Sequence, residues 1–283
     1  MEDSRETNHE QSREEKRREP VHALRGKGEW GENIGVSREC DCVIRVLKTL
    51  ILTGDDFGRS ARVNEAIERC HAAGVLTHAS LMVNEPHAEE AARIARLHPQ
   101  LRVGLHLTLC AGRASRVSAL TDAAGNFEPS PAKAGLRYFF RPSLKAALAA
   151  EIRAQFEKFR ALGFAPTYWD GHTHLHLHPT IFDLTLPIAA EHGFTFTRLV
   201  REPKPRSFLG HIFAALSARA RPRLLANNIG FADRVCGLRE TGRMTKAAFR
   251  KLIEQAPEGT TEIYFHPGAE PEELEADSRQ GKI

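Results

Sequence analysis

Strand-like and helix-like patterns alternate from residue 43 to residue 265, and this alternation limits the fold more than any other feature of the sequence. Short apolar runs predict buried strands, and longer runs with apolar residues three and four apart predict helices. The predicted strands are 43–53, 75–83, 101–109, 167–176, 194–200 and 261–265, and the predicted helices are 63–73, 88–97, 144–162, 180–192 and 245–255. Such alternation predicts an α/β fold with parallel strands covered by helices. A barrel and a doubly wound sheet both fit it.

The size and charge of the chain exclude several classes of protein. Its 283 residues suffice for one large α/β domain or two small ones. The net charge is only +4 and aromatic residues make up 7% of the chain, so no nucleic-acid partner is expected. No apolar run is long enough to span a membrane. The five cysteines lack the spacing of a disulfide framework, which favours reduced thiols and a cytoplasmic location.

Residues 1–42 differ from the rest of the chain in composition. They are charged and poor in core residues, which predicts a disordered N-terminal extension. One ordered domain is expected over residues 43–283.

Unusual polar residues fall where the predicted strands end. Asp55 and Asp56 follow the first strand, His106 lies near the end of the third, and Arg198 and His266 lie at the ends of two later strands. In either α/β arrangement, the carboxyl ends of parallel strands gather on one rim, where such folds place their chemistry. These side chains are therefore expected to converge at one site.

A row of histidines follows Asp170 in the segment WDGHTHLHLHP, where every second residue from His172 to His178 is a histidine. On a strand, residues two apart point to the same side, so four imidazoles would share one face. Neighbouring imidazoles about 6.6 Å apart could share a metal ion, but four could not. His178, which precedes a proline at the rim, is expected to have an ordinary role.

Each candidate also has an ordinary explanation. Asp55 and Asp56 alone fit a solvated turn or a helix cap, and His106 alone fits a buried histidine with satisfied nitrogens. Together they fit a metal centre better, because a dication removes the repulsion between adjacent carboxylates. One carboxylate and two imidazoles leave open positions on the ion, as in catalytic metal sites. The residues alone do not decide between the two aspartates, or among the histidines, as ligands.

An open metal site of this kind favours hydrolysis near neutral pH, because the ion polarises a carbonyl and activates water. A free aspartate can accept a proton from the water, and His266 can protonate a leaving amine. Arg198 is the candidate for an arginine that favours the charged form of the base.

Several motifs, taken in order, resemble the YdjC-like carbohydrate deacetylase family. They are TGDDFGRSARVNEAI, GVLTHASLMVN, VGLHLTL, DGHTHLHLHP within 167–179, the strand before Arg198, and YFHPG. The resemblance covers most of residues 43–268 and implies a TIM-like, somewhat irregular (β/α) barrel. Members usually continue past the final His-Pro with a helical segment, whereas about fifteen polar residues follow Gly268. The C-terminal part of the domain is therefore expected to be missing or altered.

The resemblance also implies roles for individual residues. The expected ligands of a divalent cation, usually magnesium with zinc as the alternative, are Asp56, His106 and His172. Asp55 would be the general base and His266 the general acid. Arg198 matches an arginine that follows the next strand, and His174 and His176 match histidines whose role is less settled.

A finer resemblance points to the hopanoid biosynthesis-associated branch of this family. It is carried by TGDDFG, EIRAQFEKFRALG, VREP, DRVCGLRETGRMT and TEIYFHPG. It implies removal of the acetyl group from an N-acetylglucosaminyl hopanoid, a glycolipid. The alternatives are a deacetylase of chitooligosaccharide-type sugars and a non-catalytic metal- or sugar-binding barrel. A phosphoesterase on the same barrel would need a second metal ion about 3.5–4 Å away and more carboxylates.

Residues 203–229 contain an apolar stripe flanked by arginines. The stripe consists of Phe208, Leu209, Ile212, Phe213 and Leu216, and the arginines are Arg206, Arg219, Arg221 and Arg223. An ordinary helix packed on the barrel explains this pattern. A helix that touches lipid through residues 206–225, at the surface of the inner membrane, is the alternative that a glycolipid substrate would favour. The sequence leaves a homodimer open.

Overall fold

Seven parallel strands form the sheet of this computed structural model, which describes residues 48–202 and 207–268. The strands are β1 (Lys48–Phe57), β2 (His78–Leu81), β3 (Arg102–Leu107), β4 (Tyr168–Gly171), β5 (Phe196–Thr197), β6 (Arg234–Cys236) and β7 (Gly259–Phe265). Their order in the sheet is β5-β4-β3-β2-β1-β7-β6, and every neighbouring pair is parallel. All described residues belong to one compact unit, residues 45–283.

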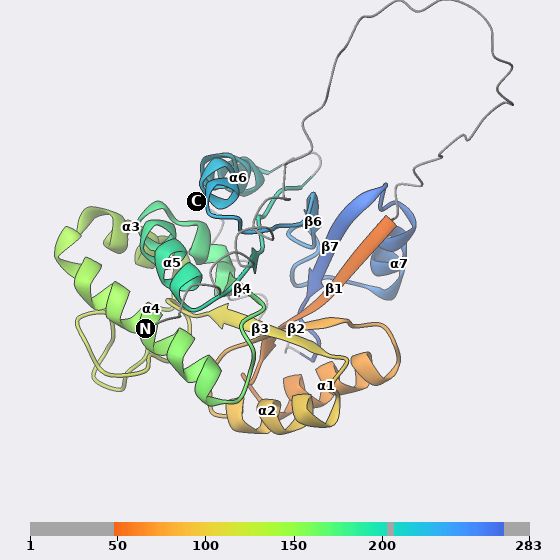
Figure 1. Cartoon of the computed structure of the whole chain (residues 1–283), viewed down its shortest axis with the longest axis horizontal. Helices are drawn as coiled ribbons and strands as arrows, with labels where there is room; N and C mark the ends of the chain where they lie inside the picture. The colour runs from red at the N-terminus through yellow and green to blue at the C-terminus, as the bar shows by residue number, and fades with distance from the viewer. Residues whose placement is uncertain (1–47, 203–206, 269–283) are drawn as a thin grey trace, which may run out of the picture. The chain divides into compact units, whose positions relative to one another are not determined.

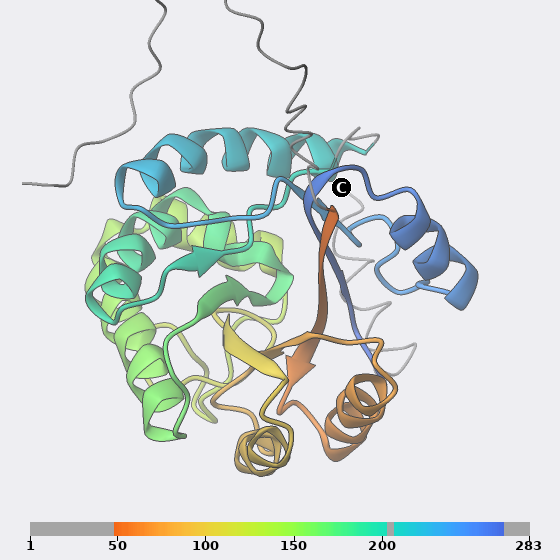
Figure 2. The ribbon, with the colours of Figure 1, turned by 45° about the vertical axis from the view of Figure 1, so that its right-hand side comes forward.

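This order is the cyclic order of a (β/α) barrel that is open between β5 and β6. The sheet curls strongly (Figures 1 and 2), but in the described ranges no continuous ladder joins β5 to β6. The backbone beside β5 is linked to the backbone beside β6 by a bridge between Phe196 and Gly230 and by a 3.3 Å hydrogen bond from Val235 N to the Arg201 carbonyl. Phe196 also packs against the apolar cluster that includes Val235. The predicted α/β class is confirmed. The TIM-like arrangement holds approximately, as a half-barrel, because the two edge strands are too short to close it.

The helices lie outside the curved sheet (Figure 2). They are α1 (Ala61–Ala72), α2 (Ala88–Leu97), α3 (Pro131–Phe140), α4 (Lys145–Ala161), α5 (Pro179–Glu191), α6 (Phe208–Ala226) and α7 (Lys246–Glu254), with 3-10 helices η1 (Pro142–Leu144) and η2 (His172–Leu177). Serine caps begin three of them, since Ser60, Ser130 and Ser207 each accept a hydrogen bond from a backbone N–H three residues later. None of the helices in the described part of the chain is long and apolar enough to cross a membrane.

The core lies between the outer face of the sheet and the helices that cover it. Ile67 of α1, Ala92 of α2 and Phe156 of α4 are fully buried there. On the inner face the side chains are more polar, and Gly104 of β3 leaves room for one aromatic ring. A Cβ at Gly104 would lie only 2.4 Å from the ring of Tyr168. The interior of the half-barrel is therefore filled at its base by Tyr168, below the polar residues at the strand ends.

The row of histidines is not on a strand, so the prediction of four imidazoles on one face is wrong. β4 ends at Gly171, and η2 follows with left-handed backbone at Thr173 (φ 53°) and His174 (φ 59°). A Cβ at Gly171 would lie 2.8 Å from the Cβ of His176, so the chain folds back closely on itself here. Because the backbone turns, the histidines point to different partners.

The other predicted elements are largely confirmed, with shifts at their ends. Helix 88–97 has the predicted bounds, whereas the predicted strand 194–200 is reduced to the two residues of β5. Helix α3 and strand β6 were not predicted. The predicted disordered extension 1–42, the start of the first strand (43–47) and the polar residues 269–283 lie outside the described residues.

Candidate metal centre and active site

Side chains from the carboxyl ends of β1 and β3 and from η2 meet inside the half-barrel. Asp56 Oδ1 lies 3.0 Å from His172 Nδ1 and 3.3 Å from His106 Nε2. All three side chains are at most 2% exposed. Their candidate ligand atoms lie within 4.8 Å of one another, close enough to contact one ion. The structure thus brings together the three residues expected to bind a cation.

Both aspartates face the interior because β1 is irregular where they stand. In a regular strand, adjacent side chains point to opposite faces. The pairing of β1 with β2 shifts register between Gly54 and Phe57, and Asp56 has a left-handed φ of 66°. Such a conformation is unfavourable for a residue with a side chain and must be held by its surroundings. Here the turn is held by Gly58 N, which donates to Asn64 Oδ1 at 2.8 Å.

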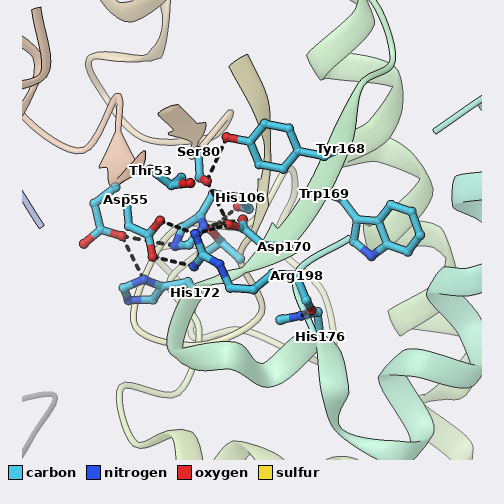
Figure 3. Close-up of polar contacts among 12 residues, drawn as sticks. Thr53, Asp55, Ser80, His106, Tyr168, Trp169, Asp170, His172, His176 and Arg198 are labelled. Atoms are coloured by element: carbon cyan, nitrogen blue, oxygen red, sulfur yellow. Dashed lines mark hydrogen bonds and ion pairs between the residues drawn. The ribbon is translucent and has the colours of Figure 1, made fainter. Parts of the chain in front are cut away.

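The orientation of His106 is set by Asp170, which the sequence places in a predicted strand but to which no role was assigned. His106 Nδ1 lies 2.7 Å from Asp170 Oδ1, while its Nε2 has no hydrogen-bond partner and faces Asp56. A carboxylate on the far nitrogen is the usual way a metal-binding imidazole is oriented. Ser80 Oγ donates to the other oxygen of Asp170 at 2.8 Å (Figure 3).

The electrostatics of this group favour positive charge at its centre. Burial alone would lower the pKa of His106, but Asp170 and Asp56 raise it to about 10. Burial alone would raise the pKa of Asp56, but His172 and His106 hold it well below its usual range. A region that stabilises a protonated imidazole this strongly also stabilises a bound cation.

A second grouping of potential ligands fits a cation less well. It consists of Asp55, His106 and Asp170. The guanidinium of Arg198 binds both of these carboxylates, and the Nδ1 of His106 is taken by Asp170. In the first grouping Arg59 pairs with one oxygen of Asp56, Oδ2 at 2.9 Å, and Oδ1 stays turned to the two imidazoles. In the first grouping the Nε2 atoms of His106 and His172 are buried without hydrogen-bond partners. The residues therefore fit a cation at the first position.

Arg198 is buried among three carboxylates. Its Nη1 and Nη2 donate to the two oxygens of Asp55 at 2.7 and 2.8 Å, and Nη2 also lies 2.8 Å from Asp170 Oδ2 (Figure 3). Its Nε donates to Glu262 Oε1 at 2.8 Å. The ring of Tyr264 covers the guanidinium, with its centroid 4.5 Å away. Asp55 is thus held by a bidentate ion pair beside the proposed ligands.

His266 follows β7 and lies farther from the centre of the group. Its ring centroid is 6.2 Å from that of Tyr264. It is close enough to Asp56 for its charge to lower the pKa of that carboxyl, after the larger effects of burial, His172 and His106. The structure places His266 at the edge of the group, on the side of β7.

The remaining histidines of the row have separate partners. His174 Nε2 lies 2.8 Å from the Tyr264 hydroxyl, and His176 Nε2 lies 2.8 Å from the Arg198 carbonyl. Burial lowers the pKa of His176 to about 4 and that of His174 well below its usual value, so both are neutral near pH 7. His178 lies at the rim, 6.1 Å from the ring of Phe139 between centroids.

Glu262 is an acid of the site that the sequence analysis missed. It lies in the strand TEIYF, directly before the apolar run Ile263–Phe265, is 3% exposed, and accepts hydrogen bonds from Arg198 and from Thr53. Acidic residues are almost never buried unless they are paired, so an acid inside an apolar strand was the available signal. Asp170 could have been assigned a role in a similar way, since it is an acid in a predicted buried strand directly before the histidine row.

Together, the fold and the site define an α/β enzyme with its polar groups at the carboxyl ends of parallel strands. The chain belongs to the YdjC-like family, because the family described as YdjC-like protein matches residues 49–282.

Curated relatives share about a third of their residues with this chain. A protein named carbohydrate deacetylase from Geobacillus stearothermophilus is 33% identical over 220 residues, which is 77% of this chain and 78% of the relative. A second, from Brevibacillus brevis, is 33% identical over 221 residues, 77% of this chain and 80% of the relative. A third, from Homo sapiens, is 33% identical over 251 residues, 77% of this chain and 74% of the relative.

A solved structure has the same fold. It belongs to a proposed cellobiose-phosphate cleavage protein from Enterococcus faecalis, with a TM-score of 0.59 and 22% identity. The match covers 81% of this chain and 84% of that chain.

Proposed function

We propose that this protein is a carbohydrate deacetylase that uses a divalent cation to remove acetate from an N-acetylated amino sugar. One observation carries the proposal. A buried aspartate and two buried imidazoles lie within ligand distance of one another, next to a second aspartate held by an arginine. The chain that bears them is 33% identical to a carbohydrate deacetylase over 77% of its length.

The residues divide the reaction between them. A divalent cation held by Asp56, His106 and His172 would polarise the acetamide carbonyl and make water more acidic. Asp55 accepts the proton of the water that attacks the carbonyl carbon. His266 donates a proton to the nitrogen as the C–N bond breaks, so acetate and a free amine are released. Magnesium or zinc is the proposed ion, and two imidazoles in the set suit zinc better than magnesium.

The test is acetate release from N,N'-diacetylchitobiose by the purified protein, measured together with its metal content. We expect acetate and free amine from protein that contains metal, none after chelation, and recovery when zinc or magnesium is added back. Protein that holds a stoichiometric metal but releases no acetate from this or any other acetylated sugar would favour the non-catalytic alternative.

We propose further that the sugar is carried by a lipid, as in N-acetylglucosaminyl hopanoid. The motifs that resemble the hopanoid-associated branch support this, and so does an apolar rim on α3 and α6. The rim consists of Leu136, Phe139, Phe140, Phe208, Leu209 and Ile212, which are exposed. Both helices contact η2, which carries His172. An apolar rim beside the site suits a substrate with an apolar tail.

The charge around this rim also suits an anionic lipid surface. No acidic residue occurs between Glu128 and Glu151, around α3, or between Glu202 and Asp233, around α6. Asp183 of the neighbouring helix α5 pairs with Arg219 and Arg223, so two of the basic groups of α6 are already partly neutralised. Such basic and apolar surfaces bind the headgroup region of membranes. This contact includes the described part of the predicted stretch 206–225. It would place the protein in the cytoplasm, at the surface of the inner membrane.

The lipid proposal is tested with two substrates and a matched surface variant. We expect the double variant Phe139→Ser/Phe208→Ser to lose activity on the glycolipid in anionic vesicles and to keep activity on diacetylchitobiose. Leu97→Ser is the control, because Leu97 is 75% exposed on α2, a helix that does not belong to the rim. If the wild type turns over diacetylchitobiose but not the glycolipid, the chitooligosaccharide alternative is favoured.

A further inference from the structure

We propose that Glu262 and His176 are positioning residues that hold Arg198 at two points and thereby aim Asp55 at the reacting water. This inference rests on the proposed function and concerns two residues to which that function gives no role. Neither residue is a proposed metal ligand, and both are buried.

Arg198 stands where the sheet gives it little support. β5 ends one residue earlier, at Thr197, and its only ladder is with β4. The Arg198 N–H donates to the Trp169 carbonyl at 3.3 Å, a long hydrogen bond. Its carbonyl accepts a second hydrogen bond, from His176 Nε2 at 2.8 Å, where a neighbouring strand would otherwise supply one. His176 therefore fixes the backbone from which the arginine side chain starts.

The other end of Arg198 is fixed by Glu262. Arg198 Nε donates to Glu262 Oε1, and this bond directs both terminal nitrogens of the planar guanidinium toward Asp55. The same oxygen of Glu262 accepts a hydrogen bond from Thr53 Oγ1 at 3.1 Å. Thr53 lies two residues before Asp55 on β1. The contacts thus form a closed circuit from β1 through Glu262 and Arg198 back to β1.

The charge of Glu262 is not needed to neutralise Arg198, because Asp55 and Asp170 already pair with it. Burying a third carboxylate beside two others is costly. Glu262 is present, we infer, because its hydrogen bond to Nε orients the guanidinium toward Asp55. In the described ranges, the side-chain hydrogen bonds of Glu262 and His176 run to Arg198 and Thr53 and not to the three proposed ligands. Loss of either residue should therefore affect turnover and leave metal binding intact.

The experiment uses one isosteric variant and one variant with a slightly larger ring. Glu262→Gln removes the charge, and His176→Phe keeps a ring but removes the donor. We expect each to lower kcat on diacetylchitobiose by about 10- to 100-fold, with KM and metal content near those of the wild type. Thr261→Val is the matched control, because Thr261 is buried on the same strand but belongs to the opposite face, and its kcat should not change.

A double variant separates positioning from a general structural effect. If Glu262 acts through Asp55, Glu262→Gln combined with Asp55→Asn should be no slower than Asp55→Asn alone. If the fold-losses in kcat of the two single variants multiply in the double variant, the proposal is overturned. A loss of metal from Glu262→Gln would also overturn it. If Glu262→Gln does not fold, Thr53→Val replaces it, since Thr53 donates to the same oxygen, and a several-fold loss of kcat is expected.

A readout without turnover keeps this proposal distinct from the proposed function. In protein labelled with ¹⁵N-arginine, the Nε–H signal of Arg198, assigned by its absence from Arg198→Lys, should exchange slowly with solvent. Glu262→Gln should speed this exchange and Thr261→Val should not. An unchanged signal in Glu262→Gln would overturn the proposed positioning. Absence of deacetylation by the wild type, with the signal behaving as expected, would overturn only the proposed function.

Discussion

Asp55 and Asp56 are neighbours in the sequence, yet the structure gives them different partners. Asp55 forms a bidentate pair with Arg198, and Asp56 faces His106 and His172. The irregularity of β1 makes this difference, because it turns both carboxylates inward while keeping them apart. A group that binds an ion and a group that accepts a proton can therefore stand side by side.

The two aspartates should respond differently to loss of their charge. Asp55→Asn should keep its bound metal and lose about 100- to 10,000-fold in kcat, the range for removal of a general base. Asp56→Asn should lose the metal, because it removes the only carboxylate of the ligand group. Metal analysis of the purified variants and acetate release on diacetylchitobiose measure both effects. A near-normal rate for Asp55→Asn would contradict its role as the base.

His78 should make the stability of the protein depend on pH. Burial, and then Arg102, lower the pKa of His78 from 6.5 to about 4. Between these values the unfolded chain binds a proton that the folded chain does not, so stability falls as the pH falls from 6.5 towards 4. His78→Gln should remove up to about 3 kcal/mol of this dependence. Urea unfolding at pH 7 and at pH 4 gives the change in the free energy of unfolding between the two pH values. The control is His211→Gln, because His211 is exposed. An equal change in both variants would reject the assignment to His78.

At the scale of elements, the sequence predicts the alternation of strands and helices well because hydrophobic periodicity is a local property. It also predicts which polar residues lie at strand ends and therefore their convergence on one rim. The choice of Asp56, His106 and His172 as ligands came from the family resemblance, and it stays a prediction that their proximity supports. It fails at η2, since the left-handed backbone at Thr173 and His174 is held by tertiary contacts and is rare for such residues. The inward turn of Asp56 could not be predicted for the same reason.

Gly104 shows how β3 and β4 depend on each other. A methyl group at this position would lie within 2.5 Å of three ring atoms of Tyr168. Gly104→Ala should therefore push Tyr168 aside and destabilise the fold by about 1–3 kcal/mol. Gly135→Ala is the control within helix α3, where the nearest atom would lie at 3.6 Å, and it should be neutral or stabilising. Urea unfolding compares the two, and equal stabilities would contradict the packing argument.

At the scale of the whole molecule, the site is assembled from parts of the chain that are distant in sequence. The hydrogen bond from Thr53 to Glu262 alone spans 209 positions. The pattern of strands left a barrel and a doubly wound sheet open, because strand order depends on long-range packing that local periodicity does not encode. The opening between β5 and β6 follows from the shortness of two strands, which residue patterns also do not fix.

Because the proposed ligands meet only in the folded chain, a bound cation should stabilise the whole molecule. An ion present at 100 times its Kd contributes about 2.7 kcal/mol, which corresponds to about 5–10 °C in the Tm of a domain of this size. Chelation should therefore lower the Tm of the wild type and of Asp55→Asn by this amount. The Tm of His172→Ala should not respond, since that variant lacks one ligand. Calorimetry with and without chelator measures these shifts, and an equal response in His172→Ala would mean that the stabilising ion binds elsewhere.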